Sequence, residues 1–287
     1  MIIKSYRWYG GKIRLVHILN FLIPEHTAYY EPFMGSAALL LNHPRSKLEV
    51  INDLDSDLVF FMKTLADSEK GEELVQRLCK LWYGKSFFEE ALDCKKHNFR
   101  GLDEIEKAAM IYTLITQSFN CTRKSFANKC FANTYEYRAD ISFHIPKVHE
   151  RLRGVHILNM NGIDVLGKIA DNPNAFAFLD PPYRKELRGV GADKAYACEL
   201  PHCEQIRLLK TIRFAKCKIM LCGYKSENGK DLYDIYLLPH GWKCYKLADI
   251  SKSCQFNKEH KDLGHEYIWV NYSLPDAAKY VISMKEY

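Results

Sequence analysis

The stretch AFAFLDPPYRKEL at residues 175–187 decides the fold. Residues 175–179 are apolar throughout and stop at an aspartate and two prolines, which is typical of a short buried strand. Such strands belong to the sheets of α/β proteins, where ligands bind beyond the carboxyl ends of the strands. Pro181 and Pro182 have no backbone N–H, so the loop that follows offers carbonyl acceptors and almost no donors. We therefore expect Asp180 at a ligand site, although a strand end with an ordinary surface turn has the same composition.

The rest of the chain alternates strand-like and helix-like segments on both sides of a helical middle part. Apolar runs typical of strands occur at residues 27–33, 47–53, 154–160, 217–224 and 265–272. Helical spacing of apolar residues dominates at residues 56–66, 71–82 and 102–119. Residues 120–154 are polar and aromatic with little periodicity. The sequence thus predicts an α/β domain formed by residues 1–58 and 155–287, with a mainly helical and basic insertion at residues 59–154.

The composition is that of an ordinary globular enzyme with a mild positive charge. The 287 residues carry 41 Lys and Arg against 35 Asp and Glu, which gives a net charge of +6. This charge is compatible with a polyanionic partner, but equally with a basic enzyme that has none. The ten cysteines form no Cys-x-x-Cys motif, and a helix start explains Cys198, His202 and Cys203 better than a zinc site does. From the cysteine pattern we expect no metal. Because there is no signal peptide and no membrane-length apolar run, we expect a cytoplasmic protein.

The first two predicted strands suggest a nucleotide site. Gly35 provides a tight turn after the first strand, which lets the backbone and a helix N-terminus approach a ligand closely. Asp53 ends the second strand at about the distance along the chain where nucleotide-binding α/β folds hold ribose hydroxyls. Asp53 would serve equally well as the N-cap of the next helix, and Asp55 and Asp57 have no better claim than that role.

The N-terminal stretch RWYGGK at residues 7–12 is less common than these features. Its glycine pair predicts a flexible loop, Lys12 can reach an anionic group, and Trp8 offers a face for stacking. An N-terminal arm whose tryptophan fills the core would have the same sequence.

Five motifs follow one another along the chain: RWYGGK, EPFMGSAALL, INDLDSDL, FLDPPY and HEYIWVNY. Their order and spacing resemble those of the Dam-type, or alpha-group, DNA adenine-N6 methyltransferases, in a phage-like or solitary branch. The motifs cover nearly all of the chain outside residues 60–165. The resemblance implies a Rossmann-like sheet that binds S-adenosylmethionine, with the insertion at residues 59–154 as the target-recognition domain.

The resemblance also implies a cofactor site. The family's contacts to S-adenosylmethionine fall on Trp8, Lys12, Glu31, Phe33, Gly35, Asp53 and Asp180, and Asp164 takes the place of a contact on the adenine side. One residue departs from the family's Phe-x-Gly-x-Gly pattern, because Ala37 stands at the second glycine. Alanine adds only a methyl group, so we expect the helix start to tolerate it at some cost in cofactor affinity.

The catalytic motif implied by the resemblance consists of Asp180, Pro181, Pro182 and Tyr183. A sulfonium methyl group is already a strong electrophile, so the reaction needs neither a metal nor a covalent nucleophile. Asp180 and the carbonyl of Pro181 would accept the two N–H bonds of the adenine amine and direct its lone pair at the methyl group. Tyr183 would stack on the adenine once it is flipped out of the duplex.

The insertion supplies the expected DNA contacts. Family members that methylate GATC carry an Asn-Gly-x-x-Arg stretch here, whereas this chain has Asn120, Cys121 and an arginine one residue early at Arg123, with Lys124 in the usual place. We expect Asn120, Arg123 and Lys124 at the DNA. Because a slip of one residue moves a side chain by about 3.5 Å, we also expect a site other than plain GATC. Interleaved aromatic residues would read the duplex or fill the gap left by a flipped base: Phe119, Phe126, Phe131, Tyr135 and Tyr137. The alternative is a solvated basic loop over a small helical core.

The sequence therefore predicts a site-specific enzyme that transfers a methyl group from S-adenosylmethionine to the N6 amine of adenine in double-stranded DNA. A cytosine-N4 enzyme more often has serine in place of Asp180, and a catalytically silent DNA-binding relic need not keep every catalytic residue. Both readings stay as alternatives. We further expect a bacterial or phage monomer that acts at the nucleoid, has no contact with membranes and has a restriction endonuclease as a potential partner.

Overall fold

The computed structural model describes residues 2–128, 130–188, 196–226, 231–251, 263–276 and 278. The chain divides into two compact units. The first unit consists of Met1–Arg14, Gly35–His43 and Asp55–Asn159. The second consists of Leu15–Met34, Pro44–Leu54 and Met160–Tyr287. The RWYGGK stretch therefore belongs to the same unit as the helices that follow residue 55.

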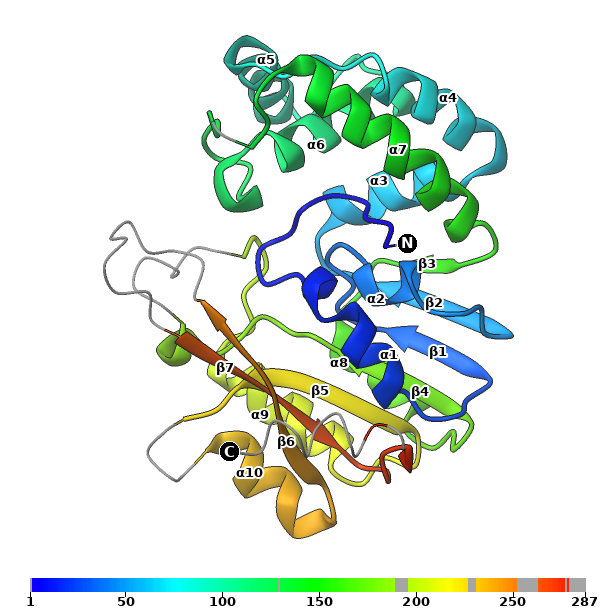
Figure 1. The fold of residues 1–287 in the computed structure, drawn as a ribbon, viewed down its shortest axis with the longest axis vertical. Helices are drawn as coiled ribbons and strands as arrows, with labels where there is room; N and C mark the ends of the chain where they lie inside the picture. The colour runs from blue at the N-terminus through cyan, green and yellow to red at the C-terminus, as the bar shows by residue number, and fades with distance from the viewer. Residues whose placement is uncertain are drawn as a thin grey trace. The chain divides into compact units, whose positions relative to one another are not determined.

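The second unit is built on a twisted sheet (Figure 1). Four of its strands run parallel in the spatial order β2 (Leu48–Asn52), β1 (Ala28–Glu31), β4 (Ala175–Leu179) and β5 (Lys218–Tyr224). Next to β5 the strand β7 (Leu263–Val270) runs antiparallel, and it pairs in turn with β6 (Lys243–Ser251). The predicted α/β class is confirmed. Because the four parallel strands point the same way, the loops that follow them leave from one edge of the sheet.

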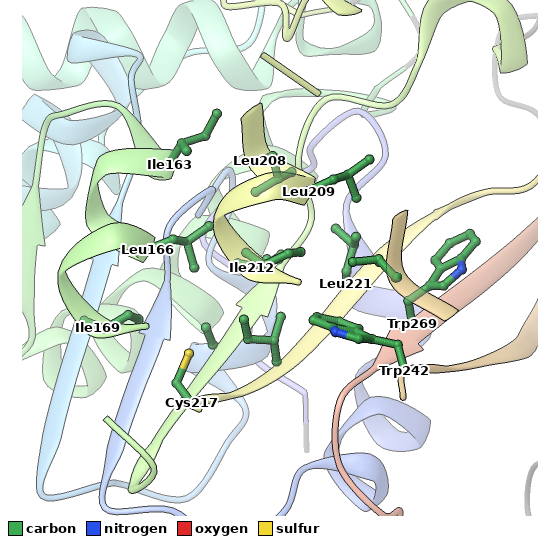
Figure 2. Close-up of a cluster of buried hydrophobic side chains, with 14 of the residues drawn as sticks. Ile163, Leu166, Ile169, Leu208, Leu209, Ile212, Cys217, Leu221, Trp242 and Trp269 are labelled. Carbon is green, nitrogen blue, oxygen red and sulfur yellow. The ribbon is translucent and has the colours of Figure 1, made fainter. Parts of the chain in front are cut away.

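Helices of the second unit pack their apolar side chains against this sheet. They are α8 (Gly162–Ile169), α9 (His202–Ile212) and α10 (Leu232–Leu237), and α1 (Val16–Leu22) belongs to the same unit. Figure 2 shows side chains of α8 and α9, among them Leu166 and Ile212, gathered with Leu221 of β5 and Trp269 of β7 in one buried cluster. Each fully buried aliphatic side chain of this kind contributes about 1.5–3 kcal/mol. The loops at the edge of the sheet therefore start from a rigid core.

The first unit is mainly helical (Figure 1). Its elements are α2 (Ala38–Leu41), α3 (Ser56–Ala66), α4 (Ser68–Leu78), α5 (Lys85–Lys96), α6 (Glu104–Thr116), α7 (Thr134–Leu152) and β3 (His156–Leu158). At the start of α3 the carboxylate of Asp55 accepts from the backbone N–H groups of Asp57 at 3.1 Å and Leu58 at 3.5 Å. Asp55, and not Asp53, is therefore the N-cap of this helix.

Helix α7 shows that the absence of periodicity predicted for residues 120–154 is wrong. Its buried apolar residues recur at every third or fourth position: Tyr137, Ile141, Ile145, Val148 and Leu152. The side chain of Asn133 caps the helix by accepting from the N–H of Glu136 at 3.0 Å. Many polar residues and Pro146, which lies inside the helix, obscured this pattern in the sequence.

Candidate active site

Asp53 and Asp180, both predicted at the site, follow the two strands that flank β1 in the sheet. β1 pairs in parallel with β2 on one side and with β4 on the other. Asp53 comes directly after β2, and Asp180 comes directly after β4. The loop that starts at Pro32, after β1, therefore leaves the sheet between them. Both aspartates are half-buried, which leaves part of each side chain open to a ligand.

The loop after β1 is closely packed. Glu31, the last residue of β1, is only 2% exposed, and its carboxylate accepts from the Tyr29 hydroxyl at 2.6 Å. Gly162, the first residue of α8, lies against the same loop. A Cβ atom at Gly162 would be 2.7 Å from the Pro32 carbonyl oxygen and 2.9 Å from the Phe33 ring. The sequence did not point to Gly162, because its importance depends on a loop that lies far away along the chain.

Two carbonyl groups of the loop after β4 are already engaged. The side-chain amide of Gln205, a buried residue of α9, donates to the Pro182 carbonyl at 2.9 Å. The guanidinium of Arg188 donates to the Tyr183 carbonyl at 2.6 Å. Within the described part of the chain, no donor reaches the carbonyl of Pro181. The loop therefore keeps one fixed carbonyl acceptor directly after Asp180.

The ring of Tyr183 packs inward. It is 5% exposed, and its hydroxyl donates to the carboxylate of Glu266 on β7. Burial raises the pKa of this phenol well above its usual range, and the charges of Asp180 and Glu266 add to the shift, so the hydroxyl stays protonated. The half-buried Tyr224, at the end of β5, meets the Tyr183 ring edge-on with the centroids 4.7 Å apart. Sequence reasoning missed Tyr224, although it ends one of the predicted strands.

Asp164 lies on the surface in the first turn of α8. Its carboxylate accepts from the guanidinium of Arg207 on α9, which also contacts Glu204. Solvent screens exposed ion pairs of this kind, so they contribute little to stability. The side chain is thus engaged in a surface contact between two helices.

In the first unit, the indole of Trp8 packs against the turn at Gly35. Gly35 has a left-handed φ of +47°, and a Cβ atom there would be 2.8 Å from the indole nitrogen of Trp8. The hydroxyl of Tyr6 donates to the Gly35 carbonyl at 2.8 Å. Only glycine suits a position with both constraints. Ala37 is also left-handed, at φ +51°, which costs an alanine roughly 1–2 kcal/mol and explains why the family pattern has glycine there.

The glycine pair before Lys12 forms a closed turn. The N–H of Gly11 donates to the Trp8 carbonyl at 3.1 Å. Lys12 begins a short 3₁₀ helix, η1 (Lys12–Arg14), and its ammonium donates to the Gly10 carbonyl at 2.9 Å. Lys12 is 5% exposed, so its charge is held inside a folded turn.

The recognition loop, defined as residues 118–127, is closed and strained. A β-bridge between Ser118 and Phe126 joins its two sides. Asn120, Cys121 and Arg123 have left-handed φ angles of +49°, +58° and +59°. Each such non-glycine residue costs about 1–3 kcal/mol and persists only where the surroundings hold it.

Arg123 provides one of the contacts that hold this loop. It is 6% exposed, and its guanidinium donates to both carboxylate oxygens of Asp55 and, at 3.3 Å, to Asp57. Lys95 also donates to Asp57, at 2.7 Å. Burial lowers the pKa of Arg123, but the hydrogen bond and charge of Asp55 and the charge of Asp57 outweigh it and raise the pKa overall. Lys124, the next residue, is exposed.

The aromatic residues of the insertion divide between core and surface. Tyr137 is fully buried and Phe131 is 7% exposed, with ring centroids 5.0 Å apart, and both pack against Tyr83. The prediction that these two rings contact the duplex is therefore contradicted by their burial. Phe119 and Tyr135 are 47% and 83% exposed.

No three His, Cys, Asp or Glu side chains in the described residues are grouped so as to hold a metal ion. The cysteines that the structure describes are free thiols, and Cys254 lies outside the described residues. Among the described helices, none is both long and apolar enough to cross a membrane.

The chain is similar in sequence to known proteins over most of its length. The family model for D12 class N6 adenine-specific DNA methyltransferases matches residues 8–246. A type II methyltransferase of Lactococcus lactis subsp. cremoris is 27% identical over 246 residues, which is 79% of this chain and 83% of the relative. The DNA N-6-adenine-methyltransferase of Escherichia phage P1 is 23% identical over 234 residues. The alignment covers 79% of this chain but only 30% of that longer protein. A structural match to a solved protein of Legionella pneumophila covers 97% of this chain and 91% of that protein's chain. The two are 12% identical, and the TM-score is 0.34.

Proposed function

The chain belongs to the D12 class N6 adenine-specific DNA methyltransferases. We propose that it methylates adenine within a specific DNA sequence and that the reaction takes place at the loop after β4. The family sets the reaction class, which is methyl transfer from an S-adenosylmethionine-type donor to the N6 amine of adenine in DNA. The cytosine-N4 enzyme and the silent relic are not favoured by these relationships.

Asp180 and Pro181 present two acceptors to the adenine amine. The bound donor supplies an electrophilic methyl group. Asp180 accepts a hydrogen bond from one N–H of the amine and the Pro181 carbonyl accepts one from the other, which aligns the lone pair. As the new N–C bond forms and the S–C bond of the donor breaks to leave a neutral thioether, the Asp180 carboxylate stabilises the positive charge on nitrogen, and the surplus N–H proton is released to solvent. The observation that carries this proposal is the Pro181 carbonyl, which no described donor reaches while the carbonyls of Pro182 and Tyr183 are held.

We assign the contact with the flipped base to Tyr224, against which the buried Tyr183 packs. Tyr183 is fixed by its bond to Glu266, so its ring forms a rigid wall beside Asp180. Tyr224 is more exposed and brings a second ring to the end of the neighbouring strand. Stacking on such rings is a general way to hold an extruded base.

The donor contacts remain proposals from the family motifs. These motifs assign the contacts to the following residues: Trp8, Lys12, Glu31, Phe33, Gly35, Asp53 and Asp180. The half-buried carboxylate of Asp53 at a strand end suits the hydroxyls of a ribose. The left-handed turn at Gly35 suits a close approach of the backbone. We do not assign Asp164 to this site, because its carboxylate accepts from the guanidinium of Arg207 on the surface.

DNA recognition falls to residues 59–154, and catalysis to residues 1–58 and 155–287. Within the recognition loop we assign the DNA contacts to Asn120 and the exposed Lys124. We assign Arg123 to holding the loop, because its guanidinium is buried against two carboxylates. Together with the one-residue slip of the arginine, this favours an adenine-containing site other than plain GATC.

Methylome sequencing of cells that express the wild-type chain or Asp180→Ala tests this function. We expect N6-methyladenine at one sequence motif for the wild type, and a loss of about 100-fold or more for the variant with duplex binding retained. Asp171→Ala is the control, since this aspartate has a 90% exposed side chain that pairs with Lys216. Near-normal methylation by Asp180→Ala would refute the mechanism. Methylation confined to plain GATC would refute only the assignment of the recognition loop.

A further inference from the structure

The last residue of β2 is a buried asparagine that joins several loops. Asn52 is 1% exposed. Its side-chain amide donates to the Pro32 carbonyl at 2.8 Å and to the Met160 carbonyl at 2.9 Å, and its side-chain oxygen accepts from the N–H of Met160 at 3.0 Å. Its backbone carbonyl accepts from the N–H of Met34 at 2.8 Å. One residue thus links the end of β2, the loop after β1 and the segment before α8.

The chemistry of this position is specific for an amide. Both N–H donors and the carbonyl oxygen of the Asn52 side chain are used, and all three partners are backbone groups. Aspartate has the same shape but offers no donor, so it would place a negative charge against two carbonyl oxygens. Alanine would leave these backbone groups without their partners in a buried place, which is costly.

The linked segments carry residues that the proposed function assigns to the donor. Phe33 follows Pro32, and Asp53 follows Asn52. Gly162, which packs against the Phe33 ring, begins α8 two residues after Met160. We infer that Asn52 is a positioning residue for the methyl-donor site, which fixes Asp53 and Phe33 relative to each other without touching the donor itself. The inference rests on the proposed function, in which Asp53 and Phe33 bind the donor.

The same unit contains a matched control. The side chain of Asn271 donates to the carbonyls of Ala215 at 3.1 Å and Cys217 at 2.8 Å, and accepts from the N–H of Ile219 at 2.7 Å. The pattern repeats that of Asn52, but Asn271 follows the antiparallel strand β7 and its bonds lie at the start of β5, at the opposite edge of the sheet from the loops after β1 and β2. Asn271→Ala therefore removes an equivalent set of bonds without altering the loops after β1 and β2.

The test measures the binding of S-adenosylmethionine to the full chain by calorimetry without DNA, together with KM, kcat and thermal unfolding. For Asn52→Ala we expect Kd and KM for S-adenosylmethionine to rise about 10- to 100-fold, with kcat at saturating donor changed far less. Asn52→Asp should weaken donor binding at least as much, and it replaces Asn52→Ala if that variant fails to fold. Asn271→Ala should lower the melting temperature comparably while leaving Kd unchanged.

The variant Asp53→Ala tests the proposed donor contacts separately from the positioning role of Asn52. If this variant binds the donor normally, the proposed donor contacts are wrong and the role of Asn52 falls with them. If Asp53→Ala weakens binding while both Asn52 variants bind normally, the positioning role alone is overturned. An equal rise in Kd for Asn271→Ala would also overturn it, because the effect would then reflect general destabilisation.

Discussion

Replacing Gln205 by leucine should slow methyl transfer and leave donor binding intact. The buried amide of Gln205 donates to the Pro182 carbonyl at 2.9 Å, and its oxygen accepts from the Tyr233 hydroxyl at 2.7 Å. Leucine deprives both groups of these partners at about 1–3 kcal/mol each, so the free energy of unfolding should fall by about 2–6 kcal/mol. Because Pro182 directly follows the Pro181 acceptor, a shift of the loop by about 1 Å should lower the transfer rate by about 100-fold.

Gln205→Glu distinguishes this role from simple destabilisation. A protonated glutamic acid can still donate to Pro182, whereas an ionised one repels the carbonyl. Burial raises the pKa of such a carboxyl above its unfolded value of about 4.3, so the folded variant is most stable below that pH and loses stability as the pH rises through its folded pKa. Its methylation rate should therefore recover as the pH falls, and that of Gln205→Leu should not.

Single-turnover methylation of a duplex at saturating donor, recorded from mildly acidic to mildly basic pH, measures both effects. Calorimetry supplies the donor affinity of each variant. Tyr233→Phe is the control, because it removes one bond to Gln205 and keeps the bond from Gln205 to Pro182. A wild-type rate for Gln205→Leu, or a wild-type pH profile for Gln205→Glu, would refute the reasoning.

Three further predictions concern packing and the recognition loop. In Gly162→Ala the added methyl group would lie 2.7 Å from the Pro32 carbonyl oxygen, so calorimetry should show a lower melting temperature and weaker donor binding; an unchanged melting temperature would mean that the loop can move aside. Arg123→Ala breaks a buried ion pair and should cost about 3–5 kcal/mol of stability with an even loss of methylation across sequences. Lys124 is exposed, so Lys124→Ala should instead leave stability normal and reduce the salt slope of DNA binding by about one. If Arg123→Ala alone relaxed the specificity at one base pair, Arg123 would contact the DNA base and Lys124 would not.

Elements with strong periodicity were predicted closely from the sequence. The apolar run at residues 175–179 is β4, and the helical pattern at residues 56–66 is α3, because a continuous apolar run and an apolar residue at every third to fourth position are both visible locally. The sequence also predicted that Asp53 and Asp180 each end a strand, and the structure places these strands on the two sides of β1. Helix α7 was missed because its buried positions are separated by many polar residues.

The contacts that hold the site could not be predicted in this way. Asn52 and Gln205 act through backbone carbonyls of loops that are distant along the chain, and no local pattern marks such a partner. Arg123 is a further example, since a basic residue in a polar loop looks the same whether it contacts DNA or a carboxylate of its own chain. The sequence can suggest which residue types are present, but long-range hydrogen bonds decide what each of them does.

The inward position of Arg123 changes which residue of the recognition loop can read the DNA. An arginine reads guanine with a free guanidinium, whereas that of Arg123 is bound to Asp55 and Asp57. Turning it outward would leave Asp55 buried without this partner, which is a large cost. Lys124 is exposed and stands where the GATC-type stretch has its arginine. Lysine offers a flexible point charge in place of a rigid planar fork, so the two are not equivalent at a bidentate contact. The expectation of a site other than plain GATC therefore rests on the chemistry of Lys124 as well as on the slip of one residue.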